Sequence, residues 1–230
     1  QRPQGNRTGS GMASRLVTVS LLAAVALGLA GCGGAAGTAG APETKGLTGP
    51  PQAELLAPGP LGEHVLGKAT APVTLIEYAS LTCPHCRNYH QNVFPKVKRE
   101  LIDTGKVRYI IREFPIGRSA GNAALVNFCA AEGKWFPLFE AYLARQSEWV
   151  SQEVRLEEIF KVAQSSGMSR ETFDKCLANQ TIIDGLNEVK QRGRKFGVIG
   201  TPTFFANGRK AQGEVTFEEI KALIEPQSSS

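Results

Sequence analysis

The feature that most constrains the fold is Cys83-Pro84-His85-Cys86, which stands where a predicted strand ends and a predicted helix begins. Residues 73–79, just before it, are almost continuously apolar and β-branched, as expected for a buried central strand. Helical spacing follows from Arg87 to Ile102, with Pro95 predicting a kink. The cysteine pair is therefore expected at a strand-to-helix junction of an α/β fold.

The position of the first cysteine predicts an ionised sulfur. Cys83 would cap the helix N-terminus, where unpaired N–H groups and the helix dipole lower a thiol pKa below its free value of about 8.5. Pro84 suits the first helical turn, and His85 adds a partly charged donor beside the sulfur. Because the thiolate is the nucleophile of disulfide exchange, Cys83 and Cys86 are the expected redox-active disulfide.

Two other uses of this cysteine pair stay open on sequence alone. A zinc site would need two more ligands at suitable spacing, and apart from His90 the candidates fall in a loop, an edge strand or distant helices. A purely structural disulfide is the second alternative, although a bridge this short at a helix start is typical of reactive pairs. We expect no metal and no cofactor.

The first 60 residues are predicted to be an export signal and a linker. Leu16 to Ala30 form an apolar run after a short basic start, which is typical of a secretory signal. The run ends in Leu29-Ala30-Gly31-Cys32, which resembles a bacterial lipobox, so lipidation of Cys32 would anchor the chain to a membrane. An ordinary cleavage site beside a stray cysteine is the alternative. We predict a signal peptide with an upstream extension in residues 1–31 and a flexible tether in residues 32–60.

The cysteine count and the charge agree with export. There are five cysteines, and an odd number in an exported protein calls for an explanation. Lipidation of Cys32 would leave two pairs in an oxidising compartment, where disulfides persist. The formal net charge is +5, but three of the basic residues (Arg2, Arg7 and Arg15) lie in the predicted signal region. The remaining balance gives no argument for nucleic acid, and we expect no such partner.

The sequence from residue 61 onward predicts one α/β domain with a helical insertion. A second strand at 107–114 completes a β–α–β unit, which favours a parallel pair with a right-handed crossover. Residues 118–197 then show helical spacing in several segments with no strand between them, so we predict an inserted helical subdomain. After this block we expect a strand at 203–206, a turn at Asn207-Gly208, a return strand at 209–212 and a helix at 216–224.

A second element, Thr201-Pro202, precedes the late strand, where proline predicts a cis peptide bond in a tight turn. With these residues in place, the chain resembles the DsbA-like branch of the thioredoxin superfamily. The matching residues are Glu77, Cys83-Pro84-His85-Cys86, Glu113-Phe114-Pro115 and Gly200-Thr201-Pro202-Thr203-Phe204-Phe205. The resemblance implies an α/β, thioredoxin-like fold in two halves, 61–117 and 198–226, separated by the inserted helical subdomain 118–197.

The resemblance also implies roles for single residues. Cys83 is the exposed attacking sulfur and Cys86 the buried resolving one. Pro202 is cis and lies against the disulfide, and Thr201 offers its backbone to an extended substrate peptide. Glu77 lies beneath the active site and relays the proton of Cys86. The alternative for Glu77 is a partly solvated residue at a strand end.

Three further residues lie outside this motif set. Some DsbA-like proteins have a second, structural disulfide at places that correspond to Cys129 and Cys176. The alternative is two buried free thiols. His90 follows Cys86 by four residues on the same helix face, and we expect an ordinary surface or packing histidine there.

The resemblance implies oxidation of cysteine pairs in unfolded or folding exported proteins by thiol:disulfide interchange, in the periplasm or cell envelope. A membrane quinone-linked partner would reoxidise the protein. Thr201 departs from the Val that many strong oxidants of the family carry before the cis-proline, so an envelope reductase or isomerase stays open. A non-catalytic binding or chaperone lipoprotein is the alternative from another class.

Overall fold

The fold is built on a five-stranded sheet. The computed structural model of the protein describes residues 50–226, and the strand order is β1-β3-β2-β4-β5. Strands β2 and β3 are parallel, as predicted for a β–α–β unit, and the other neighbouring pairs are antiparallel. The strands are β1 (His64–Leu66), β2 (Val73–Ala79), β3 (Val107–Glu113), β4 (Thr203–Ala206) and β5 (Arg209–Gln212).

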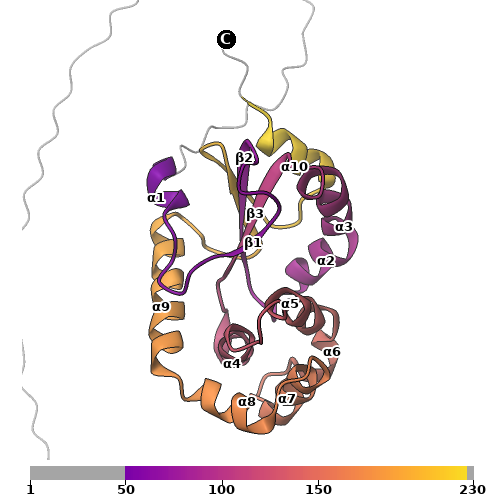
Figure 1. Cartoon of the computed structure of the whole chain (residues 1–230), viewed down its shortest axis with the longest axis vertical. Helices are drawn as coiled ribbons and strands as arrows, with labels where there is room; N and C mark the ends of the chain where they lie inside the picture. The colour runs from indigo at the N-terminus through magenta and orange to yellow at the C-terminus, as the bar shows by residue number, and fades with distance from the viewer. Residues whose placement is uncertain (1–49, 227–230) are drawn as a thin grey trace, which may run out of the picture. The chain divides into compact units, whose positions relative to one another are not determined.

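Helices cover both faces of this sheet and form a separate group at one end of it (Figure 1). Figure 1 shows α2, α3 and α10 on one side of the strands, α1 and α9 on the other, and α4 to α8 together below. The helices are α1 (Gln52–Leu56), α2 (Pro84–Asn92), α3 (Phe94–Val97), the π-helical η1 (Lys98–Ile102), α4 (Gly117–Phe128), α5 (Trp135–Ala144), α6 (Gln146–Trp149), α7 (Leu156–Ser165), α8 (Arg170–Leu177), α9 (Gln180–Lys195) and α10 (Phe217–Ile224). The arrangement is the predicted thioredoxin-like α/β fold with a helical insertion.

The helical segment after the cysteine motif is broken rather than merely kinked. Its first part, α2, ends at Asn92, and the N–H of Val93 still donates to the carbonyl of Tyr89 at 2.9 Å. Pro95 has no N–H, and its ring blocks the preceding turn, so the regular hydrogen-bond ladder cannot pass through it. The chain continues as α3 and then as the wider turn η1.

The predicted tether is wrong at its C-terminal end. Residues 52–56 form α1, and Leu55 is only 2% exposed because it joins the apolar cluster on this side of the sheet. The guanidinium of Arg192 donates to the carbonyls of Ala57 and Pro58, both at 2.8 Å. These contacts tie the segment to α9. The predicted signal peptide, the lipidated Cys32 and the rest of the tether lie outside the described residues.

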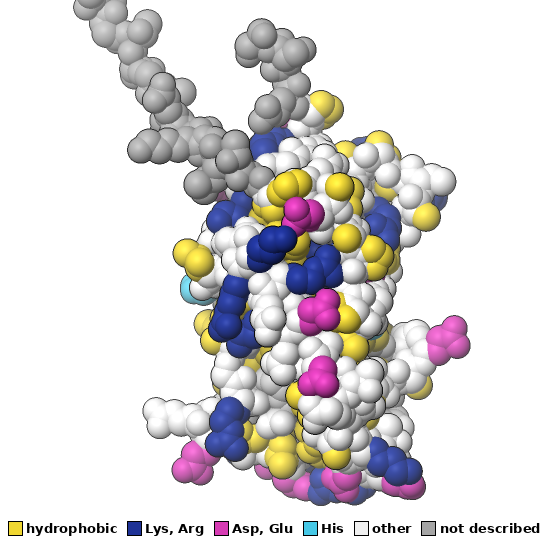
Figure 2. Space-filling view, turned by 90° about the vertical axis from the view of Figure 1, so that its left-hand side faces the viewer, with side chains coloured by type: hydrophobic (Ala, Val, Ile, Leu, Met, Phe, Trp, Pro, Cys, Tyr) yellow, Lys and Arg dark blue, Asp and Glu magenta, His cyan; other side chains and the backbone are white. Residues whose placement is uncertain are grey.

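Helix α9 approaches the sheet closely because of a glycine. A Cβ atom on Gly193 would lie 3.0 Å from the rings of Tyr78 and Phe114. The last turn of α9 carries Arg192, Arg194 and Lys195, and Lys and Arg side chains gather on the face over α9 and α1 (Figure 2). Lys195 pairs there with Glu54 at 2.7 Å.

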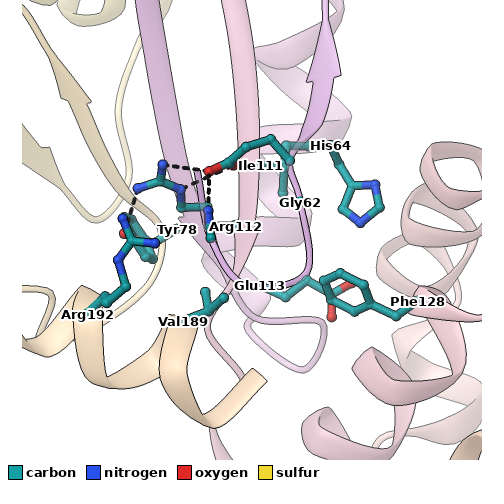
Figure 3. A pocket seen from close by; sticks show the side chains of 11 residues that line it. Gly62, His64, Tyr78, Ile111, Arg112, Glu113, Phe128, Val189 and Arg192 are labelled. Atoms are coloured by element: carbon teal, nitrogen blue, oxygen red, sulfur yellow. Dashed lines mark hydrogen bonds and ion pairs between the residues drawn. The ribbon is translucent and has the colours of Figure 1, made fainter. Parts of the chain in front are cut away.

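A buried ion pair joins the loop before β1 to β3 (Figure 3). Arg112 donates to both carboxylate oxygens of Glu63, at 2.8 and 3.3 Å, and to the hydroxyl of Tyr78 at 3.0 Å. Next to it, Glu113 accepts from Asn127 at 2.7 Å, and burial raises the pKa of this carboxyl to about 8. Glu113 therefore stays largely protonated at neutral pH, which avoids a second buried charge.

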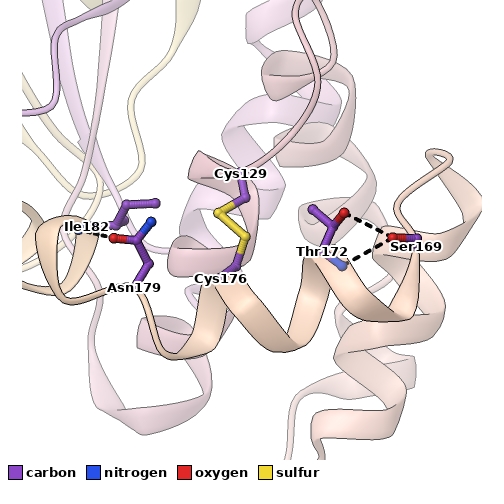
Figure 4. Close-up of a disulfide and its surroundings, with 6 residues drawn as sticks. All are labelled: Cys129, Ser169, Thr172, Cys176, Asn179 and Ile182. Atoms are coloured by element: carbon purple, nitrogen blue, oxygen red, sulfur yellow. Dashed lines mark hydrogen bonds between the residues drawn. A yellow bond between two sulfur atoms is a disulfide. The ribbon is translucent and has the colours of Figure 1, made fainter.

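A disulfide between Cys129 and Cys176 staples the helical insertion (Figure 4). Cys129 follows the end of α4, Cys176 lies in α8, and their Cα atoms are 6.2 Å apart. The bridge closes a loop with a sequence separation of 47 residues. In the chain-entropy picture, such a loop adds about 4 kcal/mol to the free energy of unfolding. The bridge thus ties α8 to the end of α4 within the insertion.

Candidate active site

The cysteine motif lies at the N-terminus of α2, a few residues after the end of β2. Cys83 is the N-cap of α2, and its sulfur accepts the N–H of Cys86 at 3.4 Å. The side chain of Gln146 donates to the carbonyls of Leu81 and Cys83 at 2.8 and 2.9 Å, which fixes the loop before the helix. Both motif cysteines are free thiols, so the site is in its dithiol form.

The Thr201-Pro202 segment lies against this motif. The peptide bond between Thr201 and Pro202 is cis, and the sulfur of Cys83 donates to the carbonyl oxygen of Thr201 at 3.2 Å. Strand β4 pairs antiparallel with β2, with Thr203 opposite Tyr78. This pairing brings Thr201, just before β4, next to Cys83, just after β2, although the two residues are 118 positions apart in sequence. Cys83, Cys86, Thr201 and Pro202 therefore form one site.

The surroundings of Cys83 favour a thiolate. Its pKa is lowered from 9.0 to about 5, mainly by the hydrogen bond from the Cys86 thiol. Partial burial opposes the shift, while the N–H groups of Cys86 and His85, which face the sulfur, add to it. The Cys86 thiol and the two N–H groups are donors to the sulfur, so at neutral pH Cys83 is ionised.

Cys86 has the opposite environment. It is fully buried, and burial raises the pKa of its thiol well above 9.0. The hydrogen bond to Cys83 and the negative charge of Glu77 raise it further. The half-buried Cys83 sulfur is thus stabilised as an anion at the helix N-terminus, while the buried Cys86 thiol stays neutral.

His85 contacts Glu214, a site residue that was not predicted from the sequence. Its Nδ1 lies 2.8 Å from a carboxylate oxygen of Glu214, and Asn88 donates to the same oxygen at 3.1 Å. The hydrogen bond to Glu214 is the main reason why the pKa of His85 is raised, and Cys83 contributes through its charge. Glu214 is 129 positions away in sequence, and no local pattern marks it.

Beneath the site lies a buried cluster centred on Glu77. This side chain is completely buried, so the alternative of a partly solvated strand end does not apply. Its carboxylate accepts from the hydroxyl of Tyr109 at 2.6 Å and lies 2.9 Å from Nε2 of His90. On the other side of the ring, Nδ1 of His90 lies 2.7 Å from Glu140 in α5.

His90 is therefore not the ordinary surface or packing histidine that we expected. Burial would lower the pKa of His90, but the charges of Glu77 and Glu140 and their hydrogen bonds raise it to about 9. The side chain is a buried imidazolium held between two carboxylates. Its spacing from Cys86 was visible in sequence, but Glu140 lies 50 positions further on, in the insertion.

The predicted site residues fall into three places. Pro84 and His85 lie in the first turn of α2 next to Cys83, Thr201 accepts a hydrogen bond from the Cys83 sulfur and precedes cis Pro202, and Glu77 is buried in β2. The Cys129–Cys176 bridge belongs to the insertion. Within residues 50–226, His, Cys, Asp and Glu side chains form no group suited to hold a metal ion.

Known proteins share this sequence pattern. The thioredoxin family model matches residues 61–226. A Rickettsia conorii protein provisionally named a protein-disulfide oxidoreductase is 34% identical over 168 residues, which are 71% of this chain and 59% of the relative. Disulfide bond formation protein D of Bacillus subtilis is 28% identical over 176 residues, covering 71% of this chain and 76% of that protein. The match spans about three fifths of the Rickettsia relatives.

Solved structures share the fold. Alpha-DsbA1 of Wolbachia pipientis superposes with a TM-score of 0.68 at 32% identity, covering 74% of this chain and 92% of that one. BdbD of Bacillus subtilis, at 24% identity and a TM-score of 0.63, covers 70% of this chain and 89% of its own. Given the family match over most of its length and a solved relative above 30% identity, this chain belongs to the DsbA-like thiol:disulfide oxidoreductases of the thioredoxin superfamily.

Proposed function

We propose that this protein oxidises cysteine pairs of exported proteins by dithiol–disulfide exchange through Cys83 and Cys86. The observation that carries the proposal is the low pKa of Cys83, about 5, beside the high pKa of buried Cys86. Each unit by which a pKa falls favours the thiolate by about 1.4 kcal/mol. A stabilised thiolate stabilises the reduced protein, so its disulfide form is a strong oxidant.

The exchange conserves atoms and charge in two steps. A substrate thiolate attacks the Cys83 sulfur of the disulfide, the bond to Cys86 breaks, and the Cys86 sulfur leaves with the electron pair and takes up a proton. A second substrate thiolate then attacks the substrate sulfur of the mixed disulfide, and Cys83 leaves as a thiolate. Two electrons pass from the substrate to the protein; one proton stays on Cys86 and the other goes to solvent.

The surroundings of the site support an extended, partly apolar substrate. Thr201 would pair its backbone with the substrate chain, with cis Pro202 beside the sulfurs. Ile199, three residues before Pro202, is 85% exposed, and Ile116, whose carbonyl accepts from the Thr82 hydroxyl, is 48% exposed. Exposed apolar side chains of this size suit contact with the apolar residues that unfolded chains present.

Export and recycling form part of the same proposal. The apolar run at residues 16–30 and the lipobox-like Cys32 support transport to the periplasm or envelope and lipid anchoring there. A membrane quinone-linked partner would regenerate the disulfide. In the part of the chain that the structure describes, no helix is long and apolar enough to span a bilayer.

Equilibration with glutathione redox buffers tests the direction of electron flow. We expect the Cys83–Cys86 pair to equilibrate at a potential more oxidising than about −180 mV, the value typical of protein disulfide isomerase. The readout is the fraction of Cys83 that reacts with an alkylating reagent at each buffer ratio. A potential near about −270 mV, as in thioredoxin, would support the reductase. A pair that does not exchange at all would support the non-catalytic binding lipoprotein.

A further inference from the structure

We propose that a hollow beside the active site binds an acidic side chain of the substrate polypeptide. The hollow has a volume of about 750 Å³ and is lined by Thr82, by residues 116–119 at the start of α4, and by the loop at residues 150–154. Thr82 directly precedes Cys83. The proposal deepens the proposed function and rests on it, because it states which substrates the exchange favours.

The sheet places this hollow across the active site from Thr201. Strand β2, which leads to Cys83, lies between β3 and β4. Thr201 precedes β4 on one side, where its carbonyl oxygen lies 3.2 Å from the Cys83 sulfur. Ile116 follows β3 on the other side, where its carbonyl accepts from the Thr82 hydroxyl at 3.3 Å. A substrate chain that lies along Thr201 and crosses Cys83 therefore reaches the hollow next.

The wall formed by α4 favours a negative charge. Helix α4 has 12 residues, and no side chain caps its N-terminus. The first N–H groups of a helix have no partner within it, and the helix dipole is positive at this end. Arg118, in the first turn, is exposed and forms no ion pair with any of the described residues. The positive charge of its guanidinium and the positive end of the helix thus meet on one wall of the hollow.

Ser119 adds a hydrogen-bond donor to the same wall. This residue is only 8% exposed, yet it lines the hollow. Among the hydrogen bonds of residues 50–226, none involves the Ser119 hydroxyl. Buried polar groups normally have a hydrogen-bond partner, so a hydroxyl in this position is suited to donate to a ligand oxygen. A carboxylate can accept from this hydroxyl and from the Arg118 guanidinium together.

The opposite wall favours a single carboxylate on a carbon chain. Glu153 lies there and is exposed, so a ligand with several negative charges would be repelled by it. Val150 and Val154 line the same wall and offer apolar contact to the methylene groups of an acidic side chain. Ligand pockets typically measure about 300–1,000 Å³, so the hollow has room for a short peptide segment. An Asp or Glu side chain of the substrate fits these features.

Peptides that differ by one side chain test the proposal. Each reduced peptide carries a pair of cysteines and either Glu or Gln near the first of them, on its amino or its carboxyl side. The oxidised full chain is mixed with each peptide, and the rate constant for loss of peptide thiols is divided by that for the neutral reagent hydroxyethyl disulfide. This ratio removes the effect of the glutamate on the peptide thiol itself. On at least one side we expect Glu to react about threefold faster than Gln or more, the scale of a partly exposed charge pair.

Variants of the two walls assign this preference to the hollow. Arg118→Gln should abolish the preference for Glu, and Ser119→Ala should weaken it. Glu153→Gln removes the opposing charge and should strengthen it. Arg194→Gln is the matched control, because Arg194 is an exposed arginine of α9 that does not line the hollow, and its loss changes the net charge equally. This control should keep the wild-type preference, and added salt should reduce the preference in both proteins.

Three results would overturn the proposal. They are equal normalised rates for Glu and Gln peptides in the wild type, an unchanged preference in Arg118→Gln, and an equal loss of preference in Arg194→Gln. Failure of the proposed function has a different signature. A reducing potential in glutathione buffers refutes the oxidase but leaves the comparison of peptide rates valid, whereas a chain that exchanges with no peptide refutes both.

Discussion

Cys83→Ser lowers the rate of thiol–disulfide exchange with a cysteine-containing peptide by at least about a thousandfold, the scale of loss on removing a nucleophile. The reason is that the reaction passes through a covalent bond to the Cys83 sulfur, and a serine hydroxyl is not ionised at neutral pH. The measurement is the rate of disulfide formation in a reduced peptide with two cysteines, followed by mass or by loss of free thiol.

This substitution should spare the fold. Serine is a favoured N-cap residue, so its oxygen can accept the N–H that the Cys83 sulfur accepts at the start of α2. Below the Cys83 pKa of about 5, where no thiolate stabilises the reduced wild type, we expect the free energies of unfolding of the variant and the reduced wild type to differ by no more than about 1 kcal/mol, because only an exchange of N-cap residues is involved. Cys86→Ser is the matched control: its Cys83 thiolate should attack a peptide that carries a disulfide, release one peptide thiolate and accumulate as the mixed disulfide, because no Cys86 thiol is present to resolve it. Full exchange activity in Cys83→Ser would refute the assigned nucleophile.

His90→Leu destabilises the protein by about 3–5 kcal/mol, the typical cost of removing one partner from a buried ion pair. The substitution leaves Glu77 fully buried with only the Tyr109 hydroxyl as donor among the contacts described. Replacing Glu77 by leucine as well removes the orphaned charge, so the double variant should be more stable than His90→Leu. Urea unfolding of the wild type, both single variants and the double variant measures the coupling.

The same cluster makes stability depend on pH in a defined window. The pKa of His90 is raised from 6.5 to about 9 on folding, so its stabilising contribution is fully present below pH 6.5 and is lost as the pH rises through about 9. The oxidised protein is the form to use, since Cys83 does not titrate in a disulfide. Glu113 also titrates on the way up, with a pKa of about 8, but it does so in wild type and His90→Leu alike. The difference between their stabilities should therefore shrink from pH 6.5 to pH 9; a constant difference would contradict a charged His90.

Local patterns predicted the parts of the fold that depend on neighbours in sequence. The apolar run at 73–79 and the cysteine motif after it specify a central strand and a capped helix. The Asn207-Gly208 turn specifies the hairpin of β4 and β5, where both residues have positive φ. The composition of residues 32–60 did not reveal that one leucine, Leu55, would be buried against the far side of the sheet.

Only those site residues that belong to sequence motifs could be predicted from the sequence. The cysteines, Thr201, Pro202 and Glu77 have fixed places in the family pattern. Glu214 and Glu140 have none, because their roles depend on how the loop before α10 and the helix α5 pack against α2. Charged contacts of this kind come from tertiary packing, and the sequence around each residue is ordinary. His90 became significant only when both of its nitrogens were seen to meet carboxylates.

The central claim is that the Cys83 sulfur is held as an anion at neutral pH. Thiolate absorbance near 240 nm, followed from acid to alkaline pH in the reduced protein with the Cys129–Cys176 bridge intact, tests it directly. The account predicts a one-thiolate rise with a midpoint near pH 5, absent in Cys83→Ser, while Cys86 stays protonated far into the alkaline range. A first rise only near pH 9, the ordinary value for a cysteine, would contradict it.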